Sequence, residues 1–251
     1  AGVTLLTDFT DGASEGFIDE PVAHNDPALI LYTSGTTGHP KGAVLTHGNF
    51  LWNTFNALVD FDITSKEMSL MISPLFHVAS LGMGALPMLI KGGTIVLEAG
   101  FDPGRALMLI EKYRITMLSG VPTTYQMMCE HPDWAKTDLS SVHHMTCGGS
   151  AVPARVLNAY EERGLAFMLS YGMTESSPGA TSMPARYSRT KAGSSGLPHY
   201  FVDMRIRDEQ NADAPVGEVG EIQLRGPNVI AEYWNKPEAS RDSFVDGNWF
   251  K

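Results

Sequence analysis

Short apolar runs alternate with amphipathic stretches over residues 28–175, and this alternation constrains the fold more than any other feature of the chain. The predicted strands lie at residues 28–32, 43–46, 69–73, 94–97, 115–118, 142–146 and 166–170. The predicted helices lie at residues 49–60, 79–90, 103–114, 122–130 and 153–163. Such alternation is typical of an α/β fold with a parallel sheet and helices on both faces. In these sheets ligands bind beyond the carboxyl ends of the strands, so the loops there are candidate sites.

The pattern changes toward the carboxyl end of the chain. Residues 202–207 alternate between apolar and polar side chains, and residues 221–225 do so again after a segment with proline and glycine. Such runs predict antiparallel strands, here the start of a smaller β-rich, barrel-like lobe. We therefore expect a polar leading segment at 1–25, an α/β core at 26–190 and a truncated β-rich subdomain at 191–251.

Charge and cysteine usage exclude several classes of protein. The chain has 18 lysines and arginines against 28 acids, a net charge of −10, which disfavours nucleic acid as a partner. Cys129 and Cys147 lack the spacing of a cysteine zinc site or a disulfide framework and fit a reducing, cytoplasmic location. No apolar run approaches the roughly 20 residues that cross a bilayer, so no transmembrane segment is expected, while peripheral membrane contact is left open.

The loop at residues 33–42 is the most informative segment. It follows an apolar strand and carries glycines that let backbone N–H groups converge on an anion, hydroxyl donors and one lysine. It is not a Walker A loop, because Pro40-Lys41-Gly42 stands where Gly-Lys-Ser/Thr is required. The candidate phosphate-binding residues are Thr33, Ser34, Gly35, Thr36, Thr37, Gly38 and Lys41.

This loop resembles the signature loop of the adenylate-forming enzymes, which include acyl-CoA and aryl-CoA synthetases, and Tyr171-Gly172-Met173-Thr174-Glu175 resembles their second strong motif. The resemblance implies that Tyr171 lies against adenine, that Thr174 contacts phosphate and that Glu175 holds Mg²⁺. A carboxylate at this point also suits Mg²⁺ chemically, since Mg²⁺ is commonly held by one or two carboxylates and substrate phosphates. The alternative for Glu175 is an ordinary acid at a helix amino terminus.

Two further segments resemble the family, one at residues 148–153 and one at 74–78. The resemblance implies an adenine site and an acyl pocket near the reacting carboxylate, with a structural role as the alternative for His77. The implied adenine-binding residues are Gly149, Ser150, Ala151, Tyr171 and Gly172. The implied acyl-pocket residues are His77, Gly148 and Met173. The implied catalytic residues are Thr174, Glu175, Lys41 and His77.

Other histidines and motifs are given structural roles. His47 is expected to be a structural helix cap, and His143 and His144 are expected to point to opposite faces of a strand, which prevents a paired metal site. Segments 217–226 and 232–238 also match the family, but we expect little catalysis from them.

The resemblance covers about residues 26–251 and is greatest to bacterial fatty-acyl-CoA synthetases. It implies activation of a carboxylic acid, here a fatty acid, by ATP with Mg²⁺, release of pyrophosphate, and transfer of the acyl group from AMP to coenzyme A. The alternatives are a non-catalytic nucleotide- or acyl-binding fragment and an enzyme for an aryl or amino acid. The family's ribose-binding aspartate and its carboxyl-terminal catalytic domain are not in the chain, which is therefore expected to be an internal fragment that is incomplete for turnover.

Overall fold

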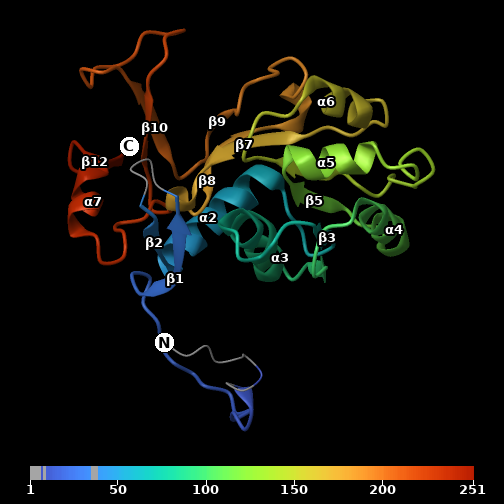
Figure 1. The fold of residues 1–251 in the computed structure, drawn as a ribbon, viewed down its shortest axis with the longest axis horizontal. Coiled ribbons are helices and arrows are strands. Elements are labelled where there is room, and N and C mark those ends of the chain that lie inside the picture. Colours follow the sequence, from blue (N-terminus) through green and yellow to red (C-terminus); the bar gives the residue numbers. More distant parts are fainter. Residues whose placement is uncertain (1–6, 8–9, 35–38) are drawn as a thin grey trace.

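A seven-stranded sheet forms the centre of the protein in the computed structural model, which describes residues 7, 10–34 and 39–251 (Figure 1). The strand order is β4-β3-β5-β6-β7-β8-β9. The bounds are β3 Met68–Met71, β4 Thr94–Leu97, β5 Met117–Gly120, β6 His144–Cys147, β7 Met168–Gly172, β8 Gly179–Met183 and β9 Leu197–Pro198. The five strands from β4 to β7 are parallel, and β8 and β9 add antiparallel. The predicted α/β fold with a parallel sheet is thus confirmed.

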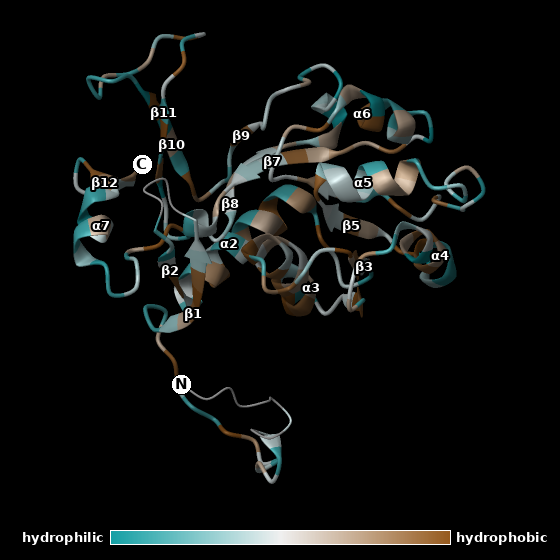
Figure 2. Cartoon of the chain, in the orientation of Figure 1, coloured by the Kyte–Doolittle hydropathy of each residue, from teal (hydrophilic) through white to brown (hydrophobic). Residues whose placement is uncertain are grey.

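Helices cover both faces of this sheet, as predicted. The bounds are α2 His47–Phe61, α3 Leu86–Lys91, α4 Pro103–Tyr113, α5 Pro122–Cys129 and α6 Ala154–Glu161. In β5, Leu118 packs in a cluster with residues of α4, α5 and α6, whereas its neighbour Met117 packs in another cluster with residues of α2 and α3. Because successive side chains of a strand point to opposite faces, the two groups of helices lie on opposite sides. Hydrophobic residues concentrate on α3 and nearby strands, whereas α7 (Pro237–Asp242) is largely hydrophilic (Figure 2).

Strands β1 (Pro27–Thr33) and β2 (Lys41–Thr46) were expected in the parallel sheet, and this expectation is wrong. They form a separate antiparallel pair in which Thr33 lies opposite Lys41. Only residues 34–40 join them, and a parallel connection needs about a dozen residues or more. The short loop therefore forces an antiparallel turn, which places the two ends of the candidate phosphate loop next to each other.

The carboxyl-terminal part of the chain forms a four-stranded antiparallel sheet in the order β10-β11-β13-β12 (Figure 1). Its strands are β10 Asp203–Arg207, β11 Glu221–Arg225, β12 Phe244–Val245 and β13 Trp249–Phe250. The predicted antiparallel strands at 202–207 and 221–225 are confirmed. Short 3₁₀ turns also span Thr174–Ser176 and Ala185–Tyr187.

Several helix boundaries follow from local chemistry. Asp102 caps α4 by accepting a hydrogen bond from the Arg105 backbone, as its position before a proline predicts. The cap of α2 is Thr46, not His47 as expected: Asn49 occupies the third helical position and completes a capping box with Thr46.

The glycine-rich start of the helix predicted at 79–90 is a π-helical turn, η1 (Ser80–Ala85), that continues into α3. A Cβ on Gly82 would lie 2.6 Å from the Ser177 carbonyl oxygen, so the glycine allows this turn to approach the segment after Glu175 closely. In the described part of the chain, no helix combines the length and apolar character needed to cross a bilayer.

Candidate active site

The candidate active site begins with a cavity of about 520 Å³ at the carboxyl ends of β3, β5, β6 and β7. This is the sheet edge at which the alternating pattern predicts ligand binding. The three residues assigned to an acyl pocket, His77, Gly148 and Met173, all line the cavity. The volume lies within the roughly 300–1,000 Å³ typical of small-molecule sites.

A second cavity of about 320 Å³ adjoins the first on the side of β7. All five residues assigned to adenine line it: Gly149, Ser150, Ala151, Tyr171 and Gly172. Three of these, Gly149, Tyr171 and Gly172, also line the first cavity. The structure therefore brings the two predicted groups of residues to the two sides of one shared wall.

Glycines keep this shared wall thin. A Cβ on Gly172 would lie 1.7 Å from the Pro178 carbonyl oxygen, and one on Gly148 would lie 2.7 Å from Ser170 Oγ. Neither position has room for a side chain unless the backbone or a neighbour moves. Both glycines are therefore required by close packing at the strand ends.

Glu175 lies beside this wall in a hydrogen-bonded cluster. Its carboxylate is buried, and Oε1 accepts hydrogen bonds from Thr33 Oγ1 (3.2 Å) and Tyr233 Oη (2.9 Å). Burial first, and then the charge of Glu175, raise the pKa of Tyr233 well above its usual range, so the phenol remains a donor. The structure thus joins Thr33 of the candidate phosphate loop to Glu175, 142 residues later in the chain.

Lys41 lies next to the same cluster. Its Nζ is 4.6 Å from the centre of the Tyr233 ring, a distance that allows a cation–π interaction. Of the other predicted phosphate ligands, Ser34 is exposed at the end of β1, while Gly35, Thr36, Thr37 and Gly38 lie outside the described residues.

Tyr233 is the residue that sequence reasoning missed. It belongs to segment 232–238, from which little catalysis was expected, yet its ring and hydroxyl contact both Lys41 and Glu175. The position is fixed because Val44 N donates to the Glu232 carbonyl (3.2 Å) and Trp234 N donates to the Gly42 carbonyl (2.7 Å), so this segment lies along β2. The only available signal was the family match of the segment itself.

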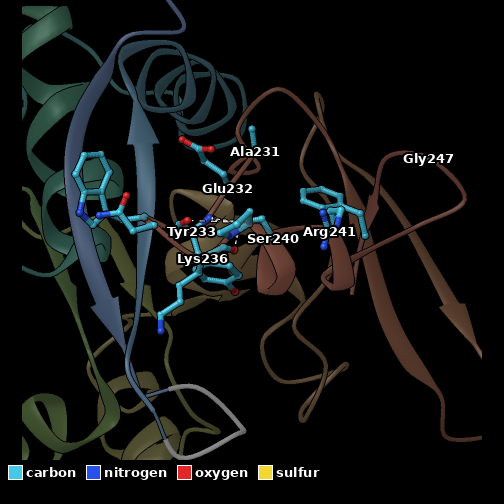
Figure 3. Close-up of a pocket in the computed structure, with 11 residues that line it drawn as sticks. Ala231, Glu232, Tyr233, Lys236, Ser240, Arg241 and Gly247 are labelled. Carbon is cyan, nitrogen blue, oxygen red and sulfur yellow. Dashed lines mark hydrogen bonds between the residues drawn. The ribbon is translucent and has the colours of Figure 1, made fainter.

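Tyr233 also borders a third hollow of about 640 Å³, formed by α7 and the segment leading into it, close to β1 and β2 (Figure 3). Lys236 and Arg241 line this hollow, and Ser240 Oγ accepts a hydrogen bond from the Tyr233 backbone at 2.9 Å. Of the predicted site residues that the structure describes, none lines it. The predicted residues therefore identify the two cavities at the sheet edge, and not this larger and more open hollow.

The chain matches the family model described as AMP-binding enzyme over residues 5–234. It belongs to the AMP-binding enzyme family. Feruloyl-CoA synthase of an Amycolatopsis species is 48% identical over 240 residues, which are 96% of this chain and 49% of that protein. Long-chain-fatty-acid–CoA ligase FadD13 of Mycobacterium tuberculosis is 32% identical over 236 residues, which are 93% of this chain and 46% of that protein.

Solved structures of AMP-binding enzymes agree with this assignment. O-succinylbenzoate coenzyme A synthetase of Bacillus subtilis, in complex with AMP, superimposes with a TM-score of 0.87 at 31% identity, covering 97% of this chain and 62% of that one. The chain spans about half the length of the curated AMP-binding enzymes that it matches. Membership in the family, predicted from the motifs, and the α/β fold, predicted from the alternation of strands and helices, are confirmed.

Proposed function

We propose that this chain supplies the ATP- and acid-binding part of an AMP-forming acid–thiol ligase that acts on an aromatic carboxylic acid. The observation that carries the proposal is the pair of adjoining cavities with a shared glycine wall, next to the cluster of Lys41, Thr33 and Glu175. An adenylating enzyme needs this arrangement, because the acid and the nucleotide must meet at the α-phosphorus while the triphosphate is held nearby.

The proposed reaction has two steps. A carboxylate oxygen of the acid attacks the α-phosphorus of ATP, the bond to the β-phosphate oxygen breaks, and pyrophosphate leaves. The thiolate of coenzyme A then attacks the acyl carbonyl, and AMP leaves with the carboxylate oxygen that formed the mixed anhydride. Catalysis of the first step rests on positioning and on stabilising charge, since no protein atom forms a covalent bond.

The residues have distinct proposed roles. Adenine is held in the second cavity, of about 320 Å³, by Tyr171, Gly172 and the segment from Gly149 to Ala151. Thr174, Lys41 and the loop from Thr33 to Gly38 hold the phosphates, with Lys41 as the point charge. His77 lies on the wall of the first cavity, of about 520 Å³, and orients the carboxylate, while Gly148 and Met173 border the acyl group.

The donor set around Glu175 fits the Mg²⁺ that accompanies ATP. The hydrogen bonds from described residues reach Oε1, which leaves Oε2 of this buried carboxylate for a cation. Oxygen ligands and one or two carboxylates per ion are what Mg²⁺ prefers. When bound, Mg²⁺ supplies positive charge to the departing pyrophosphate, and Thr33 and Tyr233 keep the carboxylate oriented.

The proposed acid is aromatic, which was the alternative to the fatty acid expected from the motifs; the fatty acid is not confirmed. Identity to feruloyl-CoA synthase is 48%, against 32% to the fatty-acid ligase. The first cavity is also lined by the rings of Phe61 and Phe101 and by Met83, which suit an aromatic ligand. The serine and threonine residues that line the same cavity are Ser73, Ser80, Ser119, Thr124, Thr146, Ser170 and Thr174.

The test is acid-dependent exchange of pyrophosphate into ATP, measured on the full-length protein with a matched panel of acids. The panel pairs hydroxycinnamic and arylacetic acids with saturated fatty acids of short, medium and long chain. We expect exchange with the aromatic acids at a kcat/KM at least about tenfold above that of any fatty acid, a difference of about 1.4 kcal/mol. Equal or greater exchange with fatty acids would contradict the aromatic assignment, and no exchange with any acid would contradict the ligase.

Domain division and location are further proposals. We propose that residues 26–190 form the nucleotide- and acyl-binding core, that 1–25 lead into it and that 191–251 belong to a second, β-rich subdomain. A cytoplasmic location and coenzyme A as the thiol substrate also remain predictions. Fractionation of the full-length protein can test its location and any peripheral contact with membranes, and assays can test the thiol.

A further inference from the structure

A cluster of two histidines and one glutamate lies at the edge of the sheet opposite the candidate active site. Glu67 immediately precedes β3, His143 immediately precedes β6, and His144 is the first residue of β6. One ligand atom from each of the three residues lies within 4.8 Å of the other two. The cluster is therefore at the amino ends of the strands, whereas both active-site cavities lie at the carboxyl ends.

The expectation that His143 and His144 point to opposite faces of a strand is wrong. Both backbone N–H groups donate to the same carbonyl, that of Thr116, at 3.0 and 3.1 Å. His143 lies outside β6, which begins at His144, so the alternation of a regular strand does not apply to this pair. The two imidazole rings lie 4.7 Å apart, centre to centre.

The hydrogen bonds of His143 leave one nitrogen directed at a carboxylate. Nδ1 is 3.0 Å from the Ser141 carbonyl oxygen, and since that oxygen can only accept, Nδ1 carries the hydrogen. In a neutral ring Nε2 then presents its lone pair, yet it lies 3.1 Å from Oε2 of Glu67. Two acceptors at this distance require a positive charge between or upon them.

Hydrogen bonds to both carboxylate oxygens orient the Glu67 side chain. Its side chain is 7% exposed, Oε2 accepts from Thr116 Oγ1 at 2.6 Å, and Oε1 accepts from Thr64 Oγ1 at 3.1 Å. Ligand carboxylates and histidines in metal sites are oriented by outer hydrogen bonds of this kind.

His144 is the third residue of the cluster, and its side chain is half-buried. Donor atoms about 2.0–2.2 Å from one zinc ion lie about 3.3–3.6 Å apart at the tetrahedral angle. The 3.1 Å between His143 Nε2 and Glu67 Oε2 is close to this spacing, and the ligand atom of His144 lies within 4.8 Å of both.

We propose that Glu67, His143 and His144 form a binding site for a divalent transition metal ion, with zinc as the probe. Imidazole nitrogens suit Zn²⁺ and its neighbours, whereas Mg²⁺ prefers an all-oxygen set, so the site is chemically distinct from the proposed Mg²⁺ site at Glu175. Three protein ligands leave one position for water. Because β3, β5 and β6 are neighbours, the bound ion connects the amino ends of β3 and β6 across β5.

The test is zinc binding to the full-length protein after chelator treatment, in competition with a chromophoric chelator and with Mg²⁺ in excess. We expect one equivalent of Zn²⁺ to bind and to raise the thermal unfolding midpoint. His143→Asn and His144→Asn should each weaken binding by at least about 100-fold and abolish the zinc-dependent rise. Glu67→Gln should do the same, and the two histidine variants keep the test decisive if this buried substitution prevents folding.

The matched control is His131→Asn. His131 also has an acidic neighbour, with Nδ1 3.7 Å from Asp133, but the described residues give it no second histidine. This variant should keep full zinc affinity. The proposal is overturned if the protein binds no equivalent of zinc in excess Mg²⁺, or if binding in His143→Asn and His144→Asn equals that of the unaltered protein, which would place the ion elsewhere.

Discussion

Removing one oxygen atom from Tyr233 tests whether the described cluster positions Glu175 for Mg·ATP. In Tyr233→Phe the ring that faces Lys41 remains, but the 2.9 Å hydrogen bond to Glu175 Oε1 is lost. Among the described residues, the 3.2 Å bond from Thr33 is then the one that still holds this buried oxygen. The substitution therefore separates orientation of the carboxylate from packing of the segment along β2.

The magnitude follows from the charge of the acceptor. A hydrogen bond to a charged group contributes about 1.5–3 kcal/mol, and water entering from the adjoining cavities offsets part of its loss. We take the net loss of stabilisation to be about 1.5–2 kcal/mol, which corresponds to a decrease of about 10–30-fold in the rate constant kcat/KM. The decrease should appear in kcat/KM for acid-dependent pyrophosphate exchange and should be accompanied by a higher Mg²⁺ concentration at half-maximal rate.

The Mg²⁺ dependence distinguishes positioning from a general loss of stability, because a merely structural role would leave it unchanged. Tyr200→Phe is the matched control, since Tyr200 is 73% exposed and meets Phe201 edge to face, while the side-chain hydrogen bonds of Glu175 within the described residues come from Thr33 and Tyr233. We expect this control to keep the rate and the Mg²⁺ dependence of the unaltered protein. If Tyr233→Phe does the same while folding normally, the reasoning about the Glu175 cluster is refuted.

Three further predictions concern the phosphate site, the glycine wall and a buried thiol. Lys41→Ala should weaken binding of ATP by at least about tenfold and of AMP much less, because a phosphate point charge is lost; equal losses for both nucleotides in calorimetry would contradict this. Gly172→Ala should lower the unfolding midpoint or prevent folding, because its Cβ meets a carbonyl oxygen at 1.7 Å, whereas Gly100→Ala, with no atom within 4 Å, should be neutral in thermal melts. Burial raises the pKa of Cys147 to about 12, so at pH 8 its thiolate fraction is on the order of 10⁻⁴ and alkylation should require unfolding; rapid alkylation of the native protein, read by mass spectrometry, would show that Cys147 is accessible.

The sequence predicts which residues gather at one edge of the sheet, because the candidate site is built from strand ends. Loops that follow parallel strands meet at one edge of the sheet, so the groups at 148–151 and 171–175 could be placed together without knowledge of the fold. Gly148 and Gly172 stand where a neighbouring side chain or the backbone crowds any added Cβ. These positions also line the cavities that the structure shows.

The parts that sequence reasoning missed depend on contacts between distant segments or on local irregularity. Tyr233 reaches Glu175 from 58 residues away, and no periodic pattern encodes that approach. Alternation of strands and helices does not carry the direction of pairing, so the antiparallel pair β1 and β2 was misplaced although its short connection was visible. His143 lies just before β6, so the period of two on which the opposite expectation rested does not apply to His143 and His144.

Transfer of a labelled oxygen tests the central claim most directly. The full-length protein is given an aromatic acid with ¹⁸O in its carboxylate, together with ATP, Mg²⁺ and coenzyme A, and the nucleotide product is examined by mass spectrometry. Attack of the carboxylate on the α-phosphorus predicts AMP that carries one ¹⁸O atom, formed in equal amount with the thioester. Label in inorganic phosphate with ADP as the nucleotide product, or AMP without label, would contradict the account.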